Sequence, residues 1–192
     1  MHSRAAVIFD LDGTLTRPYL DFDAIRAEIG IASGPILEAL AEMDGPRRAW
    51  AETILLRHEA EAAANATLQD GAGDVVAECR ARGYGVAILT RNARVMVERV
   101  LAKFELAVDA MRTREDGAIK PSPLPVLSLC EELGAKPRRS LVVGDFLFDI
   151  LSGRSAGTKT VLMIGDGSLP DYAADADHVI RRLPELLPLL EI

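Results

Sequence analysis

Apolar residues of this chain are concentrated in short unbroken runs, and each run stops abruptly at polar residues. A run of this kind is typical of a strand that is buried on both faces of a parallel sheet. The runs predict strands at residues 5–9, 84–89, 106–110, 141–143 and 160–164. Stretches of helical character lie between the later runs, at residues 74–82, 93–104, 123–133 and 148–156. This alternation of strands and helices predicts an α/β fold with a doubly wound parallel sheet.

The interval between the first two predicted strands is too long for a single crossover helix. It covers about 70 residues, most of them helical in character. Asp23 can cap a first helix, and Pro46 suits the opening turn of a long last one. We therefore divide the chain into an α/β core of residues 1–16 and 69–192 and an inserted helical cap of residues 17–68.

Composition narrows the class of protein and its partners. The chain has 192 residues, of which 49% are hydrophobic and 27% charged, and its formal net charge of −7 argues against nucleic acid and anionic membranes as partners. No apolar stretch approaches the roughly 20 residues of a membrane span, and Asp10 comes too early for a secretory signal. Cys79 and Cys130 lack the spacing of a zinc site or a redox pair. We expect a soluble, cytoplasmic protein with no nucleic-acid or membrane partner.

The strongest chemical signal is the sequence DLDGTL at residues 10–15, directly after the first predicted strand. Open parallel sheets bind ligands at the carboxyl ends of their strands, and Gly13 allows the chain to turn there. A calcium-binding loop would need a glycine at its sixth position and a glutamate at its twelfth, where this chain has Leu15 and Asp21. A plain solvated turn does not explain two carboxylates between apolar residues. The motif therefore indicates a site built on Asp10 and Asp12.

The segment AVIFDLDGTL resembles the first motif of the haloacid dehalogenase superfamily, most of whose members are phosphatases with an aspartate nucleophile. Residues that resemble the family's later motifs follow in order: Thr90 at the end of the second strand, Lys120 before a helix, and the pair Asp145 and Asp149 after a buried strand. The resemblance covers nearly the whole chain outside residues 17–68, and it is nearest to the phosphoglycolate-phosphatase-like branch with a small helical cap. It implies a Rossmann-like core with the strand order 3-2-1-4-5.

That strand order makes the first and fourth strands neighbours at the point where the winding of the sheet reverses. Asp10 and Asp145 follow these two strands, so their carboxylates converge in one crevice together with Asp12 and Asp149. Carboxylates crowded in a partly buried site repel one another, and a divalent cation relieves the repulsion. Oxygen ligands favour Mg²⁺, which we predict as the cofactor.

The resemblance also implies a role for each motif residue. Asp10 is the nucleophile that forms an aspartyl-phosphate, and Asp12 is the general acid and base. The metal ligands are the Asp10 carboxylate, the Asp12 backbone carbonyl and the Asp145 carboxylate, with Asp149 orienting the metal shell.

Phosphate binding is assigned to the residues that follow the second strand and to Lys120. The Thr90 hydroxyl and the backbone N–H groups of Arg91 or Asn92 bind phosphate oxygens at the start of a helix. Lys120 neutralises the phosphate and holds Asp10 ionised. Two simpler interpretations stay open here: Thr90 could only cap the following helix, and Lys120 could be a solvated lysine.

Other reactions of the superfamily are weighed by the residues present. A dehalogenase does not need the second aspartate, so Asp12 argues against that chemistry, and a phosphonatase needs a cap lysine, which residues 17–68 lack. A phosphomutase stays open, as does a phosphate-binding scaffold without turnover, although a scaffold would be expected to have lost one of the acids. The prediction is a Mg²⁺-dependent phosphatase acting on a phosphoglycolate-like acid or a sugar phosphate.

The cap should select the substrate, a small-molecule phosphate ester. Arg47, Arg48 and His58 are candidates for contacts to a second anionic group, and Arg91 is better placed than these. The C-terminal leucines of residues 183–192 predict a short helix that covers the sheet or forms a dimer contact. We expect a monomer or a weak homodimer.

Overall fold

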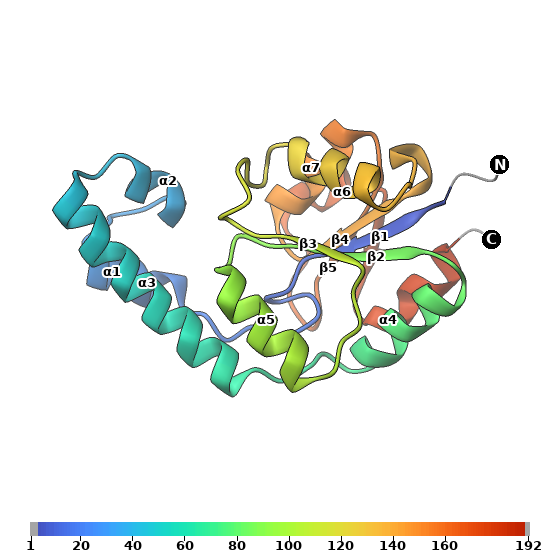
Figure 1. Cartoon of the computed structure of the whole chain (residues 1–192), viewed down its shortest axis with the longest axis horizontal. Helices are drawn as coiled ribbons and strands as arrows, with labels where there is room; N and C mark the ends of the chain where they lie inside the picture. Colours follow the sequence, from blue (N-terminus) through green and yellow to red (C-terminus); the bar gives the residue numbers. More distant parts are fainter. Residues whose placement is uncertain (1–3, 191–192) are drawn as a thin grey trace.

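The computed structural model describes residues 4–190, which form a six-stranded parallel sheet with helices on both faces (Figure 1). The strand order is β3-β2-β1-β4-β5-β6, so the predicted order is confirmed and β6 extends the sheet by one strand. Each neighbouring pair is parallel. The strands are β1 (Ala6–Phe9), β2 (Gly85–Leu89), β3 (Ala110–Arg112), β4 (Leu141–Gly144), β5 (Lys159–Met163) and β6 (His178–Ile180).

Alternate residues of β1 face two different helical layers, as the two-residue period of a strand requires. Val7 and Phe9 are fully buried in the cluster that holds α4, α5 and the 3-10 helix η3 against the sheet. Ala6 and Ile8 are buried on the other face, beneath α6, and α7 lies beside α6. The helices of this part are α4 (Ala72–Ala81), α5 (Arg94–Lys103), α6 (Leu124–Glu132) and α7 (Leu147–Ala156), with short 3-10 helices η1 (Pro137–Arg139), η2 (Asp171–Asp175) and η3 (Leu183–Leu189).

The interval between β1 and β2 forms α1 (Phe22–Ile29), α2 (Ile36–Ala41) and α3 (Gly45–Asn65), followed by α4. The first three helices share an apolar cluster of their own, which includes Ile25, Leu40 and Leu55. In Figure 1 α1 and α2 stand apart from the sheet, and α3 runs back along α5. We call α1, α2 and α3 the cap, and the division of the chain at residues 17 and 68 stays our proposal.

The chain leaves and re-enters the sheet region through two adjacent segments. The Arg17 N–H donates to the Thr67 carbonyl, and the Gln69 N–H donates to the Leu15 carbonyl, each at 2.9 Å. This two-stranded neck fixes where the cap begins relative to the end of β1.

Several sequence-based details were wrong for local reasons. The first cap helix is capped by Asp21, whose carboxylate accepts the Ala24 N–H at 2.9 Å, and not by Asp23. The strand predicted at residues 106–110 begins only at Ala110, because the Leu106 N–H closes the end of α5 on the Leu101 carbonyl.

The leucines of η3 turn inward, with Leu183 and Leu186 fully buried against the core, so they cover the sheet. Ile192, the last residue of that predicted segment, lies outside the described residues.

Two further expectations concern the described residues as a whole. Cys79 and Cys130 are both buried, and neither forms a disulfide within the described residues. None of the helices between residues 4 and 190 combines the length and the apolar character needed to cross a membrane.

Candidate active site

The loop after β1 brings its carboxylates to the edge of the sheet. The Asp10 N–H still donates to the Val143 carbonyl of β4 at 2.8 Å, and the chain then turns at Gly13, whose φ is +89°. A Cβ atom at Gly13 would lie 2.2 Å from Oδ2 of Asp145. Glycine is therefore required at this position both for the backbone conformation and for the close approach of the Asp145 carboxylate.

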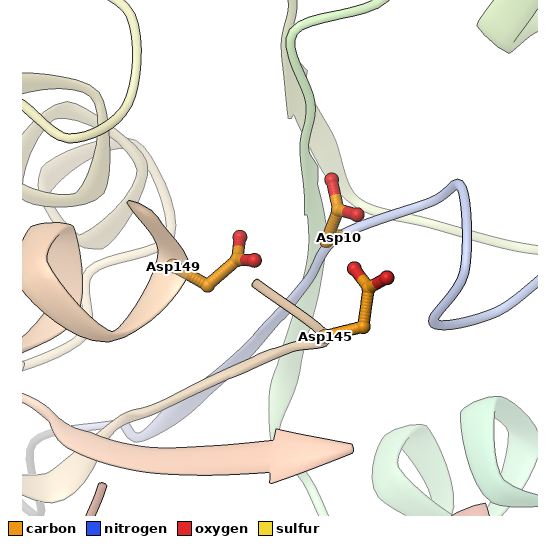
Figure 2. Close-up of side chains that lie close together, drawn as sticks. All are labelled: Asp10, Asp145 and Asp149. Atoms are coloured by element: carbon orange, nitrogen blue, oxygen red, sulfur yellow. The ribbon is translucent and has the colours of Figure 1, made fainter. Parts of the chain in front are cut away.

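Asp10, Asp145 and Asp149 form a compact cluster of acids. Each offers a carboxylate oxygen, and these oxygens all lie within 4.8 Å of one another. Figure 2 shows the three side chains converging from the end of β1, from the loop after β4 and from the start of α7. Gly144 makes room for this approach, because a Cβ atom there would lie 2.0 Å from Cγ of Asp149.

Lys120 neutralises part of the cluster. Its ammonium Nζ lies 2.6 Å from Oδ1 of Asp10 and 2.6 Å from Oδ1 of Asp149, and the residue is only 4% exposed. The structure thus brings Lys120 beside Asp10, and it is not a solvated lysine. Three carboxylates and one ammonium leave a formal charge of −2, which together with the oxygen donor set fits a divalent cation such as Mg²⁺.

Burial and mutual repulsion shift the ionisation of these acids. Burial raises the pKa of Asp10 well above its ordinary value, although the Lys120 ammonium opposes the shift. Burial, reinforced by the Asp149 carboxylate, raises the pKa of Asp145 to about 7. Burial lowers the pKa of Lys120, but the Asp10 and Asp149 carboxylates outweigh it and the net shift is upward. These directions describe a site in which negative charge is concentrated and a bound cation is favoured.

Asp12 lies apart from the three-acid cluster and has a different partner. Its Oδ2 accepts a hydrogen bond from the Asn92 side-chain amide at 2.9 Å. Burial raises the pKa of Asp12, and the Asn92 bond opposes this. The predicted metal contact of Asp12 uses its backbone carbonyl, so its carboxylate is left for another task.

The loop after β2 is arranged differently from the prediction in one respect. The Asn92 N–H donates to Thr90 Oγ1 at 3.1 Å, so that N–H already has a partner and is not free for a phosphate. Asn92 acts instead through its side-chain amide on Asp12. The N-cap of α5 is Ala93, so Thr90 is not the cap of that helix, and its hydroxyl proton can be donated elsewhere.

Arg91 lies between the sheet and the cap. Its guanidinium donates to the Lys120 carbonyl at 2.7 Å, pairs with Glu38 of α2, and lies 4.9 Å from the centre of the Phe148 ring. Its charge is therefore already matched. The sequence did not indicate Glu38, because it stands 53 residues from Arg91 and carries no motif.

A cavity of about 620 Å³ lies between the cap and the sheet. Its sheet end is polar and contains Asp10, Asp12, Thr90, Lys120, Asp145 and Asp149. The residues that the cap region contributes are largely apolar and include Leu20, Phe22, Ile36, Leu37 and Leu55, and Phe148 of α7 also lines the cavity.

The three cap residues predicted to contact substrate are placed elsewhere. Arg48 pairs with Glu52 one helical turn away at 2.7 Å, and His58 lies 2.9 Å from the Glu28 carboxylate. Neither these residues nor the exposed Arg47 line the cavity. Sequence reasoning did not single out Glu59 or Arg114, which lie 55 residues apart. The two form an ion pair, and Glu59 lines the cavity.

Comparisons with known proteins agree with this architecture. A family model for haloacid dehalogenase-like hydrolases matches residues 5–157. An uncharacterized hydrolase of Saccharomyces cerevisiae is 32% identical over 200 residues, which cover 97% of this chain and 90% of that protein. The pyrophosphatase PpaX of Bacillus mycoides is 37% identical over 124 residues, which cover 61% of this chain and 57% of that enzyme.

Solved structures show the same fold at low sequence identity. A predicted phosphoglycolate phosphatase from Haemophilus somnus superimposes with a TM-score of 0.76 at 21% identity, and the match covers 100% of both chains. CbbY from Rhodobacter sphaeroides, solved in complex with phosphate, gives a TM-score of 0.74 at 20% identity and covers 98% of this chain and 100% of that one. The fold is therefore shared with these proteins over nearly the whole length of the chain.

Proposed function

Since the chain belongs to the haloacid dehalogenase-like hydrolase family, we propose that it is a Mg²⁺-dependent phosphatase that works through an aspartyl-phosphate on Asp10. The observation that carries the proposal is the buried Asp10 carboxylate, held by Lys120 at 2.6 Å beside two further acids. Lys120 engages one oxygen of Asp10 and favours its ionised form against the effect of burial, which leaves the other oxygen for attack on phosphorus.

The reaction needs two displacements at phosphorus. In the first, an Asp10 oxygen forms a bond to phosphorus while the bond to the leaving oxygen breaks, and Asp12 gives that oxygen a proton. In the second, Asp12 takes a proton from water, the water oxygen bonds to phosphorus, and Asp10 is released. The sum is an ester plus water giving an alcohol plus phosphate.

The neighbouring residues support these steps by position and charge. Asn92 orients the Asp12 carboxylate, and burial keeps the pKa of Asp12 raised, which suits a group that must give and regain a proton. The Thr90 hydroxyl would donate to a phosphate oxygen. Asp10, the Asp12 backbone carbonyl and Asp145 would hold Mg²⁺, with Asp149 orienting it, and the bound ion would offset the charge of the phosphate.

The substrate we propose is a small phosphorylated metabolite, either a phosphoglycolate-like acid or a sugar phosphate. A cavity of about 620 Å³ has room for such a molecule. The names of two relatives, a pyrophosphatase and a predicted phosphoglycolate phosphatase, support phosphate-ester or phosphoanhydride chemistry. No feature of the described residues favours the phosphomutase or the non-catalytic scaffold over the phosphatase.

The experiment that tests the proposal is phosphate release from phenyl phosphate with and without Mg²⁺. We expect turnover that chelation abolishes, and a loss of on the order of a thousandfold or more in Asp10→Asn, because the covalent path needs the carboxylate. Asp74→Asn, at an exposed acid on α4, is the matched control and should keep its activity. Turnover retained in cleanly purified Asp10→Asn would overturn the mechanism.

A further inference from the structure

Glu59 of α3 has a buried carboxylate with a hydrogen-bond partner for only one of its two oxygens among residues 4–190. The residue lines the cavity and is 3% exposed. One carboxylate oxygen, Oε1, accepts a hydrogen bond from the Arg114 guanidinium. The other, Oε2, is buried without a hydrogen-bond partner among residues 4–190. A buried acceptor that is left unpaired is unfavourable, and since Glu59 lines the cavity, a ligand donor that reaches this oxygen there makes a bond that the protein alone does not supply.

Glu59 is on the side of the cavity where the leaving group must lie. Arg114, the partner of Glu59, donates its backbone N–H to the Asn92 carbonyl at 3.4 Å. The Asn92 side-chain amide in turn donates to Asp12, and Asp12 and Glu59 line the same cavity. The proposed mechanism has Asp12 protonating the leaving oxygen. The rest of the leaving group therefore extends from Asp12 into the cavity between sheet and cap, toward Glu59.

The cavity offers no unmatched cation to a second anionic group. Three basic residues line it within the described part of the chain, and each one has an acidic partner. Arg26 lies 2.5 Å from Asp23, Arg91 pairs with Glu38, and Lys120 is bound by the acid cluster. A carboxylate on the substrate would have to displace one of these partners and would meet the charge of Glu59.

Building on the proposed function, we infer that Glu59 selects the leaving group. Its Oε2 accepts a hydrogen bond from a hydroxyl or amine of the alcohol that is released. The substrate is accordingly a phosphomonoester of a polyol, a sugar or an amino alcohol, and not a phosphorylated acid.

Matched esters test this inference in the unaltered protein. Glycerol phosphate and propyl phosphate have the same carbon chain and differ in their hydroxyls, and phosphoethanolamine and ethyl phosphate differ in the amine. We expect kcat/KM for at least one donor-bearing ester to exceed that of its alkyl partner by about tenfold or more, because the alkyl ester leaves Oε2 unpaired. The pair that shows the difference tells whether the donor is a hydroxyl or an amine.

The variant Glu59→Gln reverses the hydrogen-bonding character at the free position. The Arg114 guanidinium can only donate, so it holds the amide oxygen, and the amide N–H₂ takes the place of Oε2. The preference for the donor-bearing ester should disappear, and kcat/KM for phosphoglycolate should rise relative to glycerol phosphate. Glu38→Gln is the matched control, because it weakens the other carboxylate–arginine pair between cap and sheet region at a residue that does not line the cavity. It should change all esters by the same factor.

The outcomes separate this inference from the proposed function. Equal rates for donor-bearing and alkyl esters in the unaltered protein would overturn the role of Glu59, even if Glu59→Gln fails to fold. An equal change for all esters in Glu59→Gln, or phosphoglycolate as the best substrate of the unaltered protein, would overturn it as well. The phosphatase itself would still stand on Mg²⁺-dependent, Asp10-dependent hydrolysis of phenyl phosphate, whose leaving group needs no partner at Glu59.

Discussion

Asp12 and Asp10 follow the same strand, yet they have different partners, and this difference predicts two separable steps. The variant Asp12→Asn keeps the nucleophile and the Lys120 contact. It should still accept phosphate from an aryl ester, whose leaving group needs little protonation, and then stall because no base activates water. Mass spectrometry of the intact protein should show an adduct of one phosphate.

The double variant Asp10→Asn with Asp12→Asn is the control for that experiment and should show no adduct. If Asp12→Asn instead turns over aryl and alkyl esters at equal, unstalled rates, another group is the acid and base.

Because Gly13 lies against the Asp145 carboxylate, we expect a substitution at Gly13 to weaken metal binding as well as to strain the backbone. At Gly13, alanine would have to adopt a positive φ, and its Cβ atom would also clash with Oδ2 of Asp145. At Gly157 (φ +78°), alanine would suffer the same backbone strain, but no atom lies within 4 Å of its Cβ position. Gly157→Ala should therefore lower the free energy of unfolding by about 1–2 kcal/mol without other effect. Gly13→Ala should also raise the Mg²⁺ concentration needed for half-maximal activity by about tenfold or more, since a displaced carboxylate weakens a metal site.

Titration of both variants with Mg²⁺, alongside urea denaturation, measures the two effects separately. An unchanged Mg²⁺ requirement in a folded Gly13→Ala protein would show that Asp145 does not need its observed position.

At the scale of elements, the local hydrophobic pattern was sufficient to predict the strands that are buried on both faces of the sheet. β1, β2, β4 and β5 follow unbroken apolar runs, and the acids that follow β1 and β4 could be placed together because parallel strands end at one edge. β6 was missed because only one of its residues, Ile180, is buried, so the sequence carries no such run.

Residues that pair over long distances in the sequence lay beyond that kind of reasoning. Glu59 and Glu38 look like ordinary surface acids of a helix in the sequence. They acquire a role only when folding sets them against Arg114 and Arg91. The predicted site motifs were recognisable because each is local, and these two ion pairs were not because each joins the cap to the sheet region.

Asp109 lies directly before β3, and its bonds to β2 lead us to predict that the stability of the protein depends on pH. Its backbone N–H donates to the Val86 carbonyl at 2.7 Å, and its carboxylate accepts the Val86 N–H at 2.9 Å and lies 2.5 Å from the Arg80 guanidinium. Burial opposes ionisation of Asp109, but these bonds outweigh it and lower its pKa. Asp109→Asn should therefore lower the free energy of unfolding by about 1–2 kcal/mol at neutral pH.

The sign of the pH effect follows from the lowered pKa. The stabilisation by Asp109 is complete above the pKa of the unfolded chain, about 3.9, and is lost as pH falls through the lower pKa of the folded state. Urea denaturation of both proteins should show a constant difference from neutral pH down to about 5 and a shrinking one below about 4. A difference that stays constant into strong acid would contradict the role of the carboxylate charge.

At the scale of the whole molecule, the cap and the sheet region each have their own packing, and the cavity that holds the candidate site lies between them. The cap has its own apolar cluster, separate from those of the sheet. Across the cavity the pairs Glu38–Arg91 and Glu59–Arg114 join them, while α3 packs along α5. Under the proposed function, closure of the cap over the phosphate would exclude water and add contacts to the leaving group, so we expect these ion pairs to support catalysis as well as stability.

Removing one of these two ion pairs should let the cap move away from the sheet region without unfolding either of them. Arg91→Ala deletes the Glu38 pair and the contacts to the Lys120 carbonyl and the Phe148 ring. Glu38 is half exposed, so the pair contributes on the order of 1 kcal/mol, and KM should rise about fivefold for every ester. Small-angle X-ray scattering should show a larger radius of gyration.

The matched control is the double variant Arg47→Ala with Arg48→Ala, which removes two cap arginines that do not line the cavity. It should leave both KM and the scattering unchanged. Salt of about 1 M weakens a partly exposed ion pair, so it should raise KM of the unaltered protein toward that of Arg91→Ala and have less effect on the variant. If KM and scattering of Arg91→Ala match those of the unaltered protein, the packing of α3 on α5 alone holds the cap over the site.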